Sequence, residues 1–207
     1  NSLLFGAGAL LLALPMGVVV SIVATREKRG SRVAEALLTA PLAVSGIVLG
    51  LGMLQTLVFG TVLFGYRITV TGPVAIVAAH AVAAYPFVSR NVTPALGSID
   101  DRLVDAARAL GADRTTALLD VELPLVVPAL VAGAAFTFAI SVGEFDSTVL
   151  LAEGVDSATM PVALERYTGN RSLGPNLGPA TAMGTVLLAV TTVSFVLIDR
   201  VGQGWNQ

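Results

Sequence analysis

A few ionisable side chains lie inside or beside long apolar stretches, where a charge is costly and therefore informative. His80 is the only histidine and lies within VAAHAVAAYPF, while Glu144 and Asp146 follow another apolar run in VGEFDS. An ionisable group inside a membrane-spanning helix can mark a translocation path, and a carboxylate pair at its mouth can receive a cationic solute. The alternatives are a neutral His80 bonded to a neighbouring helix and an ordinary solvated helix end at Glu144 and Asp146. These three residues are the candidate translocation path.

Catalytic chemistry has little support in the sequence. His80 has no acidic residue beside it in sequence, and there is no H-E-x-x-H motif of the kind that binds zinc. The chain has no cysteine, which excludes disulfides, thiolate metal sites and cysteine nucleophiles. We therefore predict no catalytic residue, no metal and no cofactor.

A charged segment, residues 98–123, separates two apolar stretches and has the pattern of two short helices. Ser98, followed by Asp101 three residues later, resembles a capping box at the start of the first helix. The first helix is predicted over about 99–110.

The end of that helix and the start of the next have their own signals. Gly111 suits the left-handed conformation that commonly ends a helix. Asp113 can cap a second helix over 114–122, and Pro124 lies where the next apolar stretch begins. The segment is thus predicted to form two helices that reverse at Gly111.

The first of these helices has a short apolar stripe made of Leu103, Ala107 and Leu110. One interpretation is a surface helix anchored among lipid headgroups. Acidic neighbours such as Asp105 disfavour contact with anionic lipid, and small alanine side chains suit insertion into a protein groove. The stripe therefore favours docking to a partner protein.

The composition is that of an integral membrane protein. Of 207 residues, 55% are hydrophobic and 13% are charged, and the mean hydropathy is +0.82, whereas soluble domains carry about 25% charged residues. The net charge of −2 does not indicate a nucleic-acid partner. Spanning the hydrocarbon core takes about 20 apolar residues, and five segments qualify: 3–24, 36–60, 72–89, 124–143 and 178–198. The predicted fold is an all-α, polytopic membrane helix bundle with about five transmembrane helices.

The distribution of basic residues predicts the orientation of the bundle. One side carries Arg26, Lys28, Arg29, Arg32, Arg90, Arg102, Arg108, Arg114 and Arg200, and the other carries Arg67, Arg166 and Arg171. The positive-inside rule places the richer side, with residues 98–123, in the cytoplasm. The 144–177 connection is then external, and its Glu165, Arg166 and Arg171 are candidate contacts for an external protein.

Residues 98–123 also carry a family resemblance. Permease subunits of binding-protein-dependent ABC importers have an EAA loop: EAA, three residues, Gly, nine residues, Ile, one residue and Leu-Pro. This chain matches the spacing with Asp105, Ala106, Ala107, Gly111, Val121, Leu123 and Pro124. It departs from the pattern with Asp for Glu at 105 and Val for Ile at 121. The chain from about residue 30 onward resembles this MetI-like family, and ISVGEFDSTVLLAEG is similar to the C-terminal half of thiamine and ferric-iron permeases.

The resemblance implies one transmembrane permease domain over 1–207, expected to be one half of a longer fused permease, with 98–123 as its coupling loop. It implies a plasma- or inner-membrane location and three partners: a cytoplasmic ATPase dimer, an extracytoplasmic binding protein and a second permease half or subunit. No G-x-x-x-x-G-K-S/T phosphate loop is present, so ATP hydrolysis is expected in the partner. By carry-over, the ATPase-coupling residues are Asp105, Ala106, Ala107, Arg108, Gly111, Val121, Leu123 and Pro124.

The solute implied by the C-terminal resemblance is thiamine or iron(III). Sulfate, molybdate and polyamine permeases share the loop and remain alternatives. An ion-driven secondary transporter would also fit interrupted spans and His80, although it leaves the EAA spacing unexplained. An intramembrane enzyme and a scaffold without transport are further alternatives.

Overall fold

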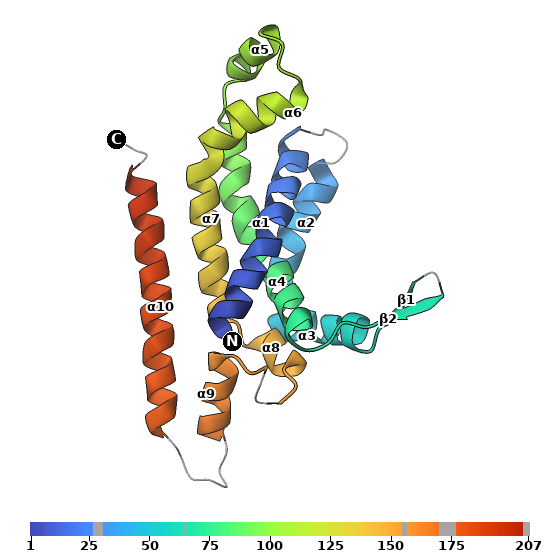
Figure 1. The fold of residues 1–207 in the computed structure, drawn as a ribbon, viewed down its shortest axis with the longest axis vertical. Helices are drawn as coiled ribbons and strands as arrows, with labels where there is room; N and C mark the ends of the chain where they lie inside the picture. Colours follow the sequence, from blue (N-terminus) through green and yellow to red (C-terminus); the bar gives the residue numbers. More distant parts are fainter. Residues whose placement is uncertain (27–30, 64, 155–156, 170–176, 205–207) are drawn as a thin grey trace.

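In the computed structural model, which describes residues 1–26, 31–63, 65–154, 157–169 and 177–204, four helices are long and apolar enough to cross a membrane. They are α1 (Ser2–Arg26), α4 (Gly72–Gly97), the continuous helix Arg114–Gly143 and α10 (Leu177–Gly204). The helix Arg114–Gly143 consists of α6 (Arg114–Ala117), η2 (Leu118–Glu122) and α7 (Leu123–Gly143). The all-α membrane bundle is confirmed. Figure 1 shows α1, α4 and α7 side by side, with α10 along the outside.

The prediction of one span over 36–60 is wrong. This stretch is divided into α2 (Ser31–Ala43), α3 (Gly46–Met53) and the π-helix η1 (Leu54–Val58). Ser45 leaves the helical conformation with ψ of 148° and accepts a hydrogen bond from the Val48 amide, so it ends the run of α2 and caps α3. An apolar run alone does not reveal such a break. In Figure 1, α3 turns aside from α2 toward a small hairpin.

That hairpin and three short helices complete the described structure. Strands β1 (Thr61–Leu63) and β2 (Tyr66–Ile68) are antiparallel, with Val62 opposite Arg67. The helix α5 (Asp101–Ala109) lies with α6 at one end of the bundle, which we call the α5–α6 end. The helices α8 (Asp146–Leu151) and α9 (Met160–Gly169) lie at the opposite end, the α8–α9 end (Figure 1).

Small residues allow α1, α4 and α7 to pack closely. A Cβ added to Gly17 of α1 would lie 2.5 Å from the Val88 Cβ, and one added to Gly133 of α7 would lie 2.9 Å from the Val88 Cα. The Ser89 hydroxyl donates to the Gly17 carbonyl at 2.9 Å across the α1–α4 contact. Close backbone approach and interhelical hydrogen bonds are the main sources of helix association in lipid. Val88 of α4 is thus held between α1 and α7.

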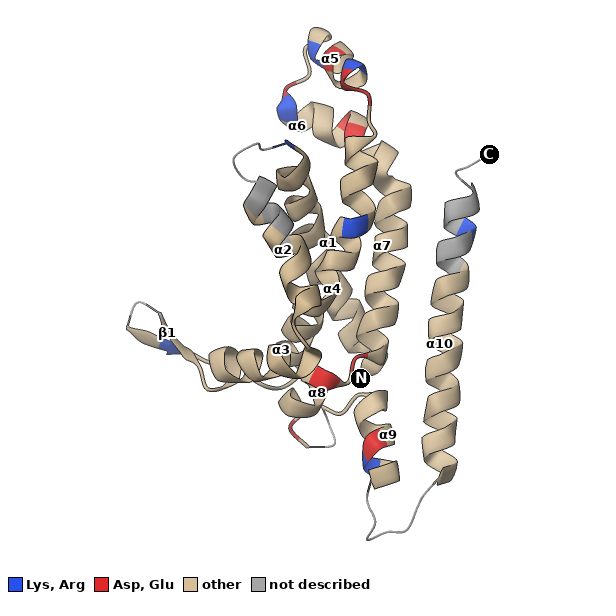
Figure 2. Ribbon diagram, turned by 180° about the vertical axis from the view of Figure 1, so that it is seen from behind, with Lys and Arg blue, Asp and Glu red and all other residues tan. Residues whose placement is uncertain are grey.

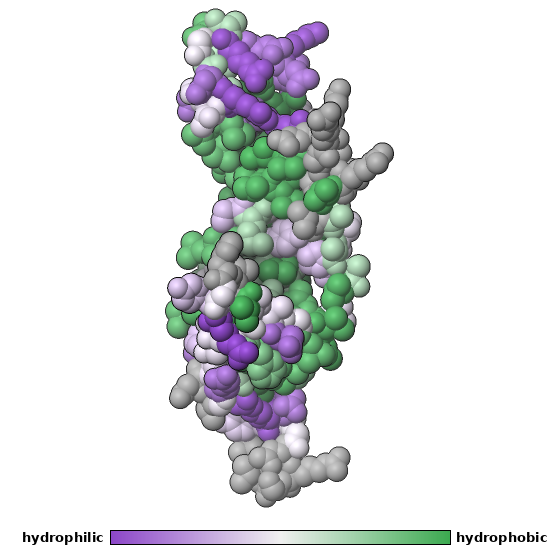
Figure 3. Space-filling model, turned by 90° about the vertical axis from the view of Figure 1, so that its right-hand side faces the viewer, coloured by the Kyte–Doolittle hydropathy of each residue, from purple (hydrophilic) through white to green (hydrophobic). Residues whose placement is uncertain are grey.

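Most of the surface between the two ends is apolar, and the exposed Arg90 of α4 is an exception. Figure 3 shows a hydrophobic surface between polar regions at the two ends, and Figure 2 shows charged residues gathered on α5 and α6 and again on α8 and α9. Many exposed large side chains are apolar, among them Leu4, Leu11, Val19, Val186, Leu188 and Val196. Such a surface suits contact with lipid or with another membrane subunit.

Candidate functional site

The start of α5 differs from the prediction. Ser98 does not cap α5: it follows the last turn of α4, and its hydroxyl donates to the Ala95 carbonyl at 2.8 Å. Asp100 takes the capping position, where its Oδ1 accepts from the Arg102 amide at 2.9 Å. The prediction failed because α4 continues beyond the apolar stretch, which ends near Arg90 in the sequence.

The reversal at Gly111 is confirmed. Gly111 has a φ of +96°, in the left-handed region that favours glycine. The Ala112 amide donates to the Ala107 carbonyl at 3.0 Å, which satisfies a carbonyl at the end of α5. The Asp113 cap is also confirmed, since its Oδ1 accepts from the Thr116 amide at 2.7 Å. Hydrogen bonds from the Thr116 side chain and backbone lower the pKa of Asp113 below its ordinary value of 3.8.

The predicted second helix is present, but it does not end before the next span. It continues through η2 into α7, and the direction of the chain changes between α6 and α7 (Figure 1). Pro124 has no amide to donate to the Asp120 carbonyl, and its ring crowds that carbonyl, which accounts for the wider π turn just before it. Val121 and Leu123 flank this bend and are half-buried.

The helix α5 protrudes from the bundle with no buried side chain within residues 101–109. Leu103 is 50% exposed and Leu110 is 91% exposed. The sequence-predicted residues Asp105, Ala106, Arg108 and Gly111 are exposed as well, and Ala107 is half-buried. The apolar stripe of α5 is therefore accessible to a partner.

Two charged residues that sequence analysis did not single out join this end to the bundle. Arg26, the last residue of α1, forms an ion pair with Glu122, the last residue of η2. The side chain of Glu122 is fully buried, and that of Arg26 is 24% exposed. An isolated carboxylate at the start of the apolar run LPLVV was a signal for Glu122, but its partner lies in a distant part of the sequence.

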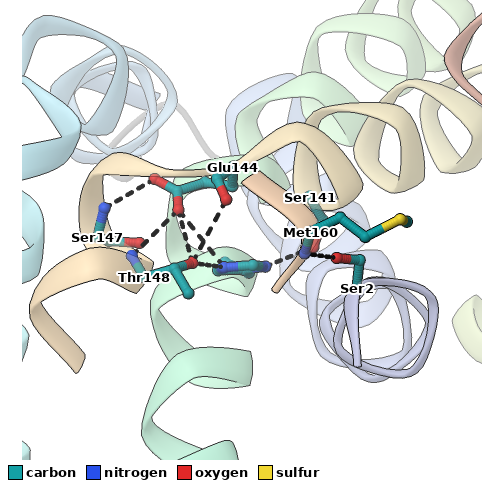
Figure 4. A network of polar contacts seen from close by, with 7 residues as sticks. Ser2, Ser141, Glu144, Ser147, Thr148 and Met160 are labelled. Carbon is teal, nitrogen blue, oxygen red and sulfur yellow. Dashed lines mark hydrogen bonds and ion pairs between the residues drawn. The ribbon is translucent and has the colours of Figure 1, made fainter. Parts of the chain in front are cut away.

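At the α8–α9 end, His80 is fully buried and both of its ring nitrogens have partners. Nδ1 lies 2.7 Å from the Ser141 Oγ at the end of α7, and Nε2 lies 2.6 Å from the Thr148 Oγ1 of α8. The Thr148 Oγ1 is also 2.9 Å from the Glu144 Oε2 (Figure 4).

One set of proton positions satisfies this whole network. Because a carboxylate only accepts, the Thr148 hydroxyl donates to Glu144. Nε2–H of His80 then donates to Thr148, and the Ser141 hydroxyl donates to Nδ1. A neutral His80 therefore fastens α4 to both α7 and α8. This is the arrangement expected of a histidine bonded to neighbouring helices.

The two candidate carboxylates have different surroundings. Glu144 turns back to cap α8, with Oε1 accepting from the Ser147 amide at 3.0 Å, and its Oε2 lies 3.5 Å from the His80 Nε2 (Figure 4). Asp146 is exposed, and its Oδ2 would lie 3.0 Å from a Cβ added to Gly46 of α3. Among the described residues no hydrogen bond or ion pair joins Asp146 to His80 or Glu144. The structure thus brings His80 and Glu144 together and leaves Asp146 apart.

The remaining candidates lie on α9. Glu165 and Arg166 are exposed, and Arg166 Nη1 donates to the Gly154 carbonyl at 2.9 Å. Arg171 lies outside the described residues. The pair on α9 is therefore exposed, with Arg166 bonded to a carbonyl of the same chain.

Sequence and structure comparisons agree on the class of protein. Over 92% of its length, the chain is 28% identical to the molybdenum transport system permease protein ModB of Escherichia coli (strain K12), covering 86% of that protein. It is 31% identical over 98% of its length to a probable molybdenum ABC transporter permease protein of Haloferax volcanii, covering 74% of it. It is 30% identical over 88% of its length to the sulfate transport system permease protein CysT of Salmonella typhimurium, covering 68% of it.

Solved structures share the fold. A chain of the inward-facing MetNI methionine ABC transporter superposes with a TM-score of 0.75 at 22% identity, covering 98% of this chain and 92% of that one. A chain of a bacterial alginate ABC transporter, in complex with its pentasaccharide-bound periplasmic protein, gives a TM-score of 0.73 at 17% identity, with 97% and 74% covered. The family model for the binding-protein-dependent transport system inner membrane component matches residues 10–207. The chain belongs to this family of ABC importer permeases.

Proposed function

We propose that the chain carries a solute delivered by an extracytoplasmic binding protein and is driven by a separate ATPase that binds the α5–α6 end. The observation that carries the proposal is the protruding α5, whose apolar stripe is exposed next to a glycine-built reversal at Gly111. A surface groove along Ala107, Gly111, Ala112 and Val121 offers space for a partner side chain. ATP-driven closure of the partner would then tilt α7 through its continuous connection to α6.

In this proposal the α5–α6 end is cytoplasmic. The support is the charge pattern, since Arg26, Arg108 and Arg114 line one cleft at that end. The α8–α9 end then faces outward and presents Glu165 and Arg166 to the binding protein. The exposed apolar faces of the bundle pair with a second permease subunit or half, which leaves residues 1–207 as one transmembrane domain.

For the solute we propose a tetrahedral oxyanion such as molybdate or sulfate. The relatives named above are molybdenum and sulfate permeases, and this favours the alternative solutes over thiamine and iron(III). The geometry points the same way, because Glu144 is occupied with capping α8 and bonding Thr148. A cation would find no free carboxylate pair at Glu144 and Asp146. His80 and Glu144 line the path only if this polar network opens during transport.

The test is uptake by vesicles that hold the chain with its ATPase and binding protein. We expect ATP-dependent uptake of molybdate or sulfate, and no uptake of thiamine or iron(III). Uptake that persists without ATP and collapses with the ion gradient would contradict the proposal and support an ion-driven transporter.

A substitution at Gly111 tests the docking step. Valine at Gly111 is strained at φ +96° although no heavy atom lies within 4 Å of the added Cβ, so only the reversal is affected. We expect Gly111→Val to lose the ATPase on co-purification and to lose ATP-dependent uptake. Gly97→Val, which also has an unobstructed Cβ and lacks a positive φ, is the control.

A further inference from the structure

The ion pair between Arg26 and Glu122 connects two parts of the chain that no helix connects directly. Arg26 ends α1, and Glu122 ends η2, the π turn between the α5–α6 end and α7. Movement of α5 and α6 has a covalent route into α7 through η2. The ion pair gives it a second, non-covalent route into α1.

Glu122 lies at a buried position where an apolar residue would be expected to stabilise the fold about as well as a carboxylate. The EAA pattern leaves the residue between Val121 and Leu123 unspecified, so the pattern itself does not account for the carboxylate of Glu122. Its side chain is fully buried. Removing a carboxylate from water is costly, and a buried ion pair is often no more stabilising than apolar residues of similar volume. We therefore assign the Glu122 carboxylate a role in positioning α1 relative to η2 rather than a role in stability.

The surroundings make Glu122 the counter-charge for a basic cleft. Arg26, Arg108 and Arg114 line a cleft of about 560 Å³ together with Asp101 and Asp105. Arg108, Arg114 and Asp101 are close enough to Arg26 to interact with it electrostatically. Among the described residues that line the cleft there are three guanidinium groups and two carboxylates, and Glu122, paired with Arg26, adds a third carboxylate. Neutralising Glu122 would therefore release Arg26 into mutual repulsion with Arg108 and Arg114.

The far side of α1 is firmly joined to the bundle. A Cβ added to Gly17 of α1 would lie 2.5 Å from the Val88 Cβ of α4, and Ser89 donates a hydrogen bond to the Gly17 carbonyl. A displacement of the α1 end would therefore move α4 as well. We propose that Arg26 and Glu122 are positioning residues for energy coupling, whose ion pair makes α1 and α4 follow the α5–α6 end when the ATPase moves it. This inference rests on the proposed function.

The first experiment measures solute transported per ATP hydrolysed by the complete complex in vesicles, with radiolabelled molybdate and sulfate as probes. The variants are Glu122→Gln, Arg26→Gln and the double variant, with Arg26→Lys as the conservative substitution. Glu153→Gln is the matched control, because it makes the same chemical change at an exposed residue outside the α5–α6 end. Co-purification of the ATPase and its ATP hydrolysis rate are measured in each case.

We expect each single neutralisation to reduce solute per ATP roughly tenfold, while the ATPase still binds and hydrolyses ATP. The double variant should be no worse than either single variant, because both changes remove one interaction. Arg26→Lys and Glu153→Gln should resemble the wild type. Wild-type stoichiometry in both single variants, or an equal loss in Glu153→Gln, would overturn the inference alone. Absence of ATP-dependent transport by the wild type would overturn the proposed function and this inference with it.

A second measurement keeps the ion pair intact, so it does not depend on whether the charge variants assemble. The chain has no cysteine, so spin labels attached at Thr115→Cys on α6 and Val19→Cys on α1 before assembly react at no other residue of this chain. Both positions are exposed. In the otherwise unaltered complex we expect the distance between the labels to stay constant when ATP binds, because the pair moves both elements together. A change of that distance through the ATP cycle would overturn the inference.

Discussion

The two ends of the bundle are attached to it in different ways. At the α8–α9 end, His80 uses both ring nitrogens to hold α7 and α8, and Glu144 caps α8 within the same network. At the α5–α6 end, α5 has no buried side chain, and an ion pair between Arg26 and Glu122 joins α1 to η2. One end is fastened by several short hydrogen bonds around a neutral His80, and the other by an ion pair beside a charged cleft.

The difference indicates where the molecule resists motion and where it accepts it. A buried hydrogen-bond network holds its elements in one arrangement, since each broken bond leaves an unsatisfied group. An exposed helix with few buried contacts opens or shifts at low cost. Binding of a partner at the α5–α6 end can therefore move elements whose opposite ends are held fixed.

The largest expected effect comes from breaking the three-helix packing that both ends share. Gly133→Leu would force its Cβ to within 2.9 Å of the Val88 backbone. We expect a loss of about 3 kcal/mol of stability or more, because the obstruction is backbone rather than a flexible side chain. Unfolding in detergent measures it, with Gly143→Leu as the control, since no heavy atom lies within 4 Å of its added Cβ. Equal stability of the two variants would contradict the packing.

The second largest effect is expected from removing His80, the central residue of the network at the α8–α9 end. His80→Ala deprives the Ser141 and Thr148 hydroxyls of a partner and leaves a cavity. We expect destabilisation of about 2 kcal/mol, measured by the same unfolding assay, and smaller losses for Ser141→Ala and Thr148→Val. If His80→Ala abolished transport while leaving stability unchanged, His80 would belong to the path rather than to the fastening of α8.

A substitution at the α5–α6 end should change binding of the ATPase and leave the stability of the fold nearly unchanged. Leu110 is 91% exposed, so Leu110→Ala should change stability by less than about 0.5 kcal/mol. Its affinity for the ATPase should fall roughly tenfold, as for a contact buried at an interface. Titration with the purified ATPase measures this. Leu188→Ala on α10, where the side chain is 67% exposed, is the control and should bind the ATPase normally.

The smallest effect concerns the Asp113 cap. Hydrogen bonds from Thr116 lower the pKa of Asp113 in the folded chain. The cap therefore stabilises α6 above the ordinary pKa of 3.8 and loses its effect as the pH falls through the lowered value. The carboxyl ¹³C shift of labelled aspartate, assigned with Asp113→Asn, should titrate below 3.8. Titration above that pH would show that the cap does not form.

Much of the α5–α6 end could be predicted from sequence, because its determinants are local. Gly111 and Asp113 act on backbone groups within a few residues, and both predictions are confirmed. The cap at Ser98 failed because the end of α4 depends on how far a helix continues past its apolar stretch. The span over 36–60 failed for a related reason, since the break at Ser45 lies within a stretch that is long and apolar enough to pass for one span.

The sequence by itself determined that the chain is a helical membrane permease with an EAA-type loop. Hydropathy and the spacing of nearby residues can be read from the sequence without knowing the fold. Only the tertiary structure decided which polar residues meet. The bonds of His80 with Ser141 and Thr148, and the pair of Arg26 with Glu122, join residues far apart in the chain. Such contacts depend on the packing of α1, α4 and α7 around small residues, which no local pattern specifies.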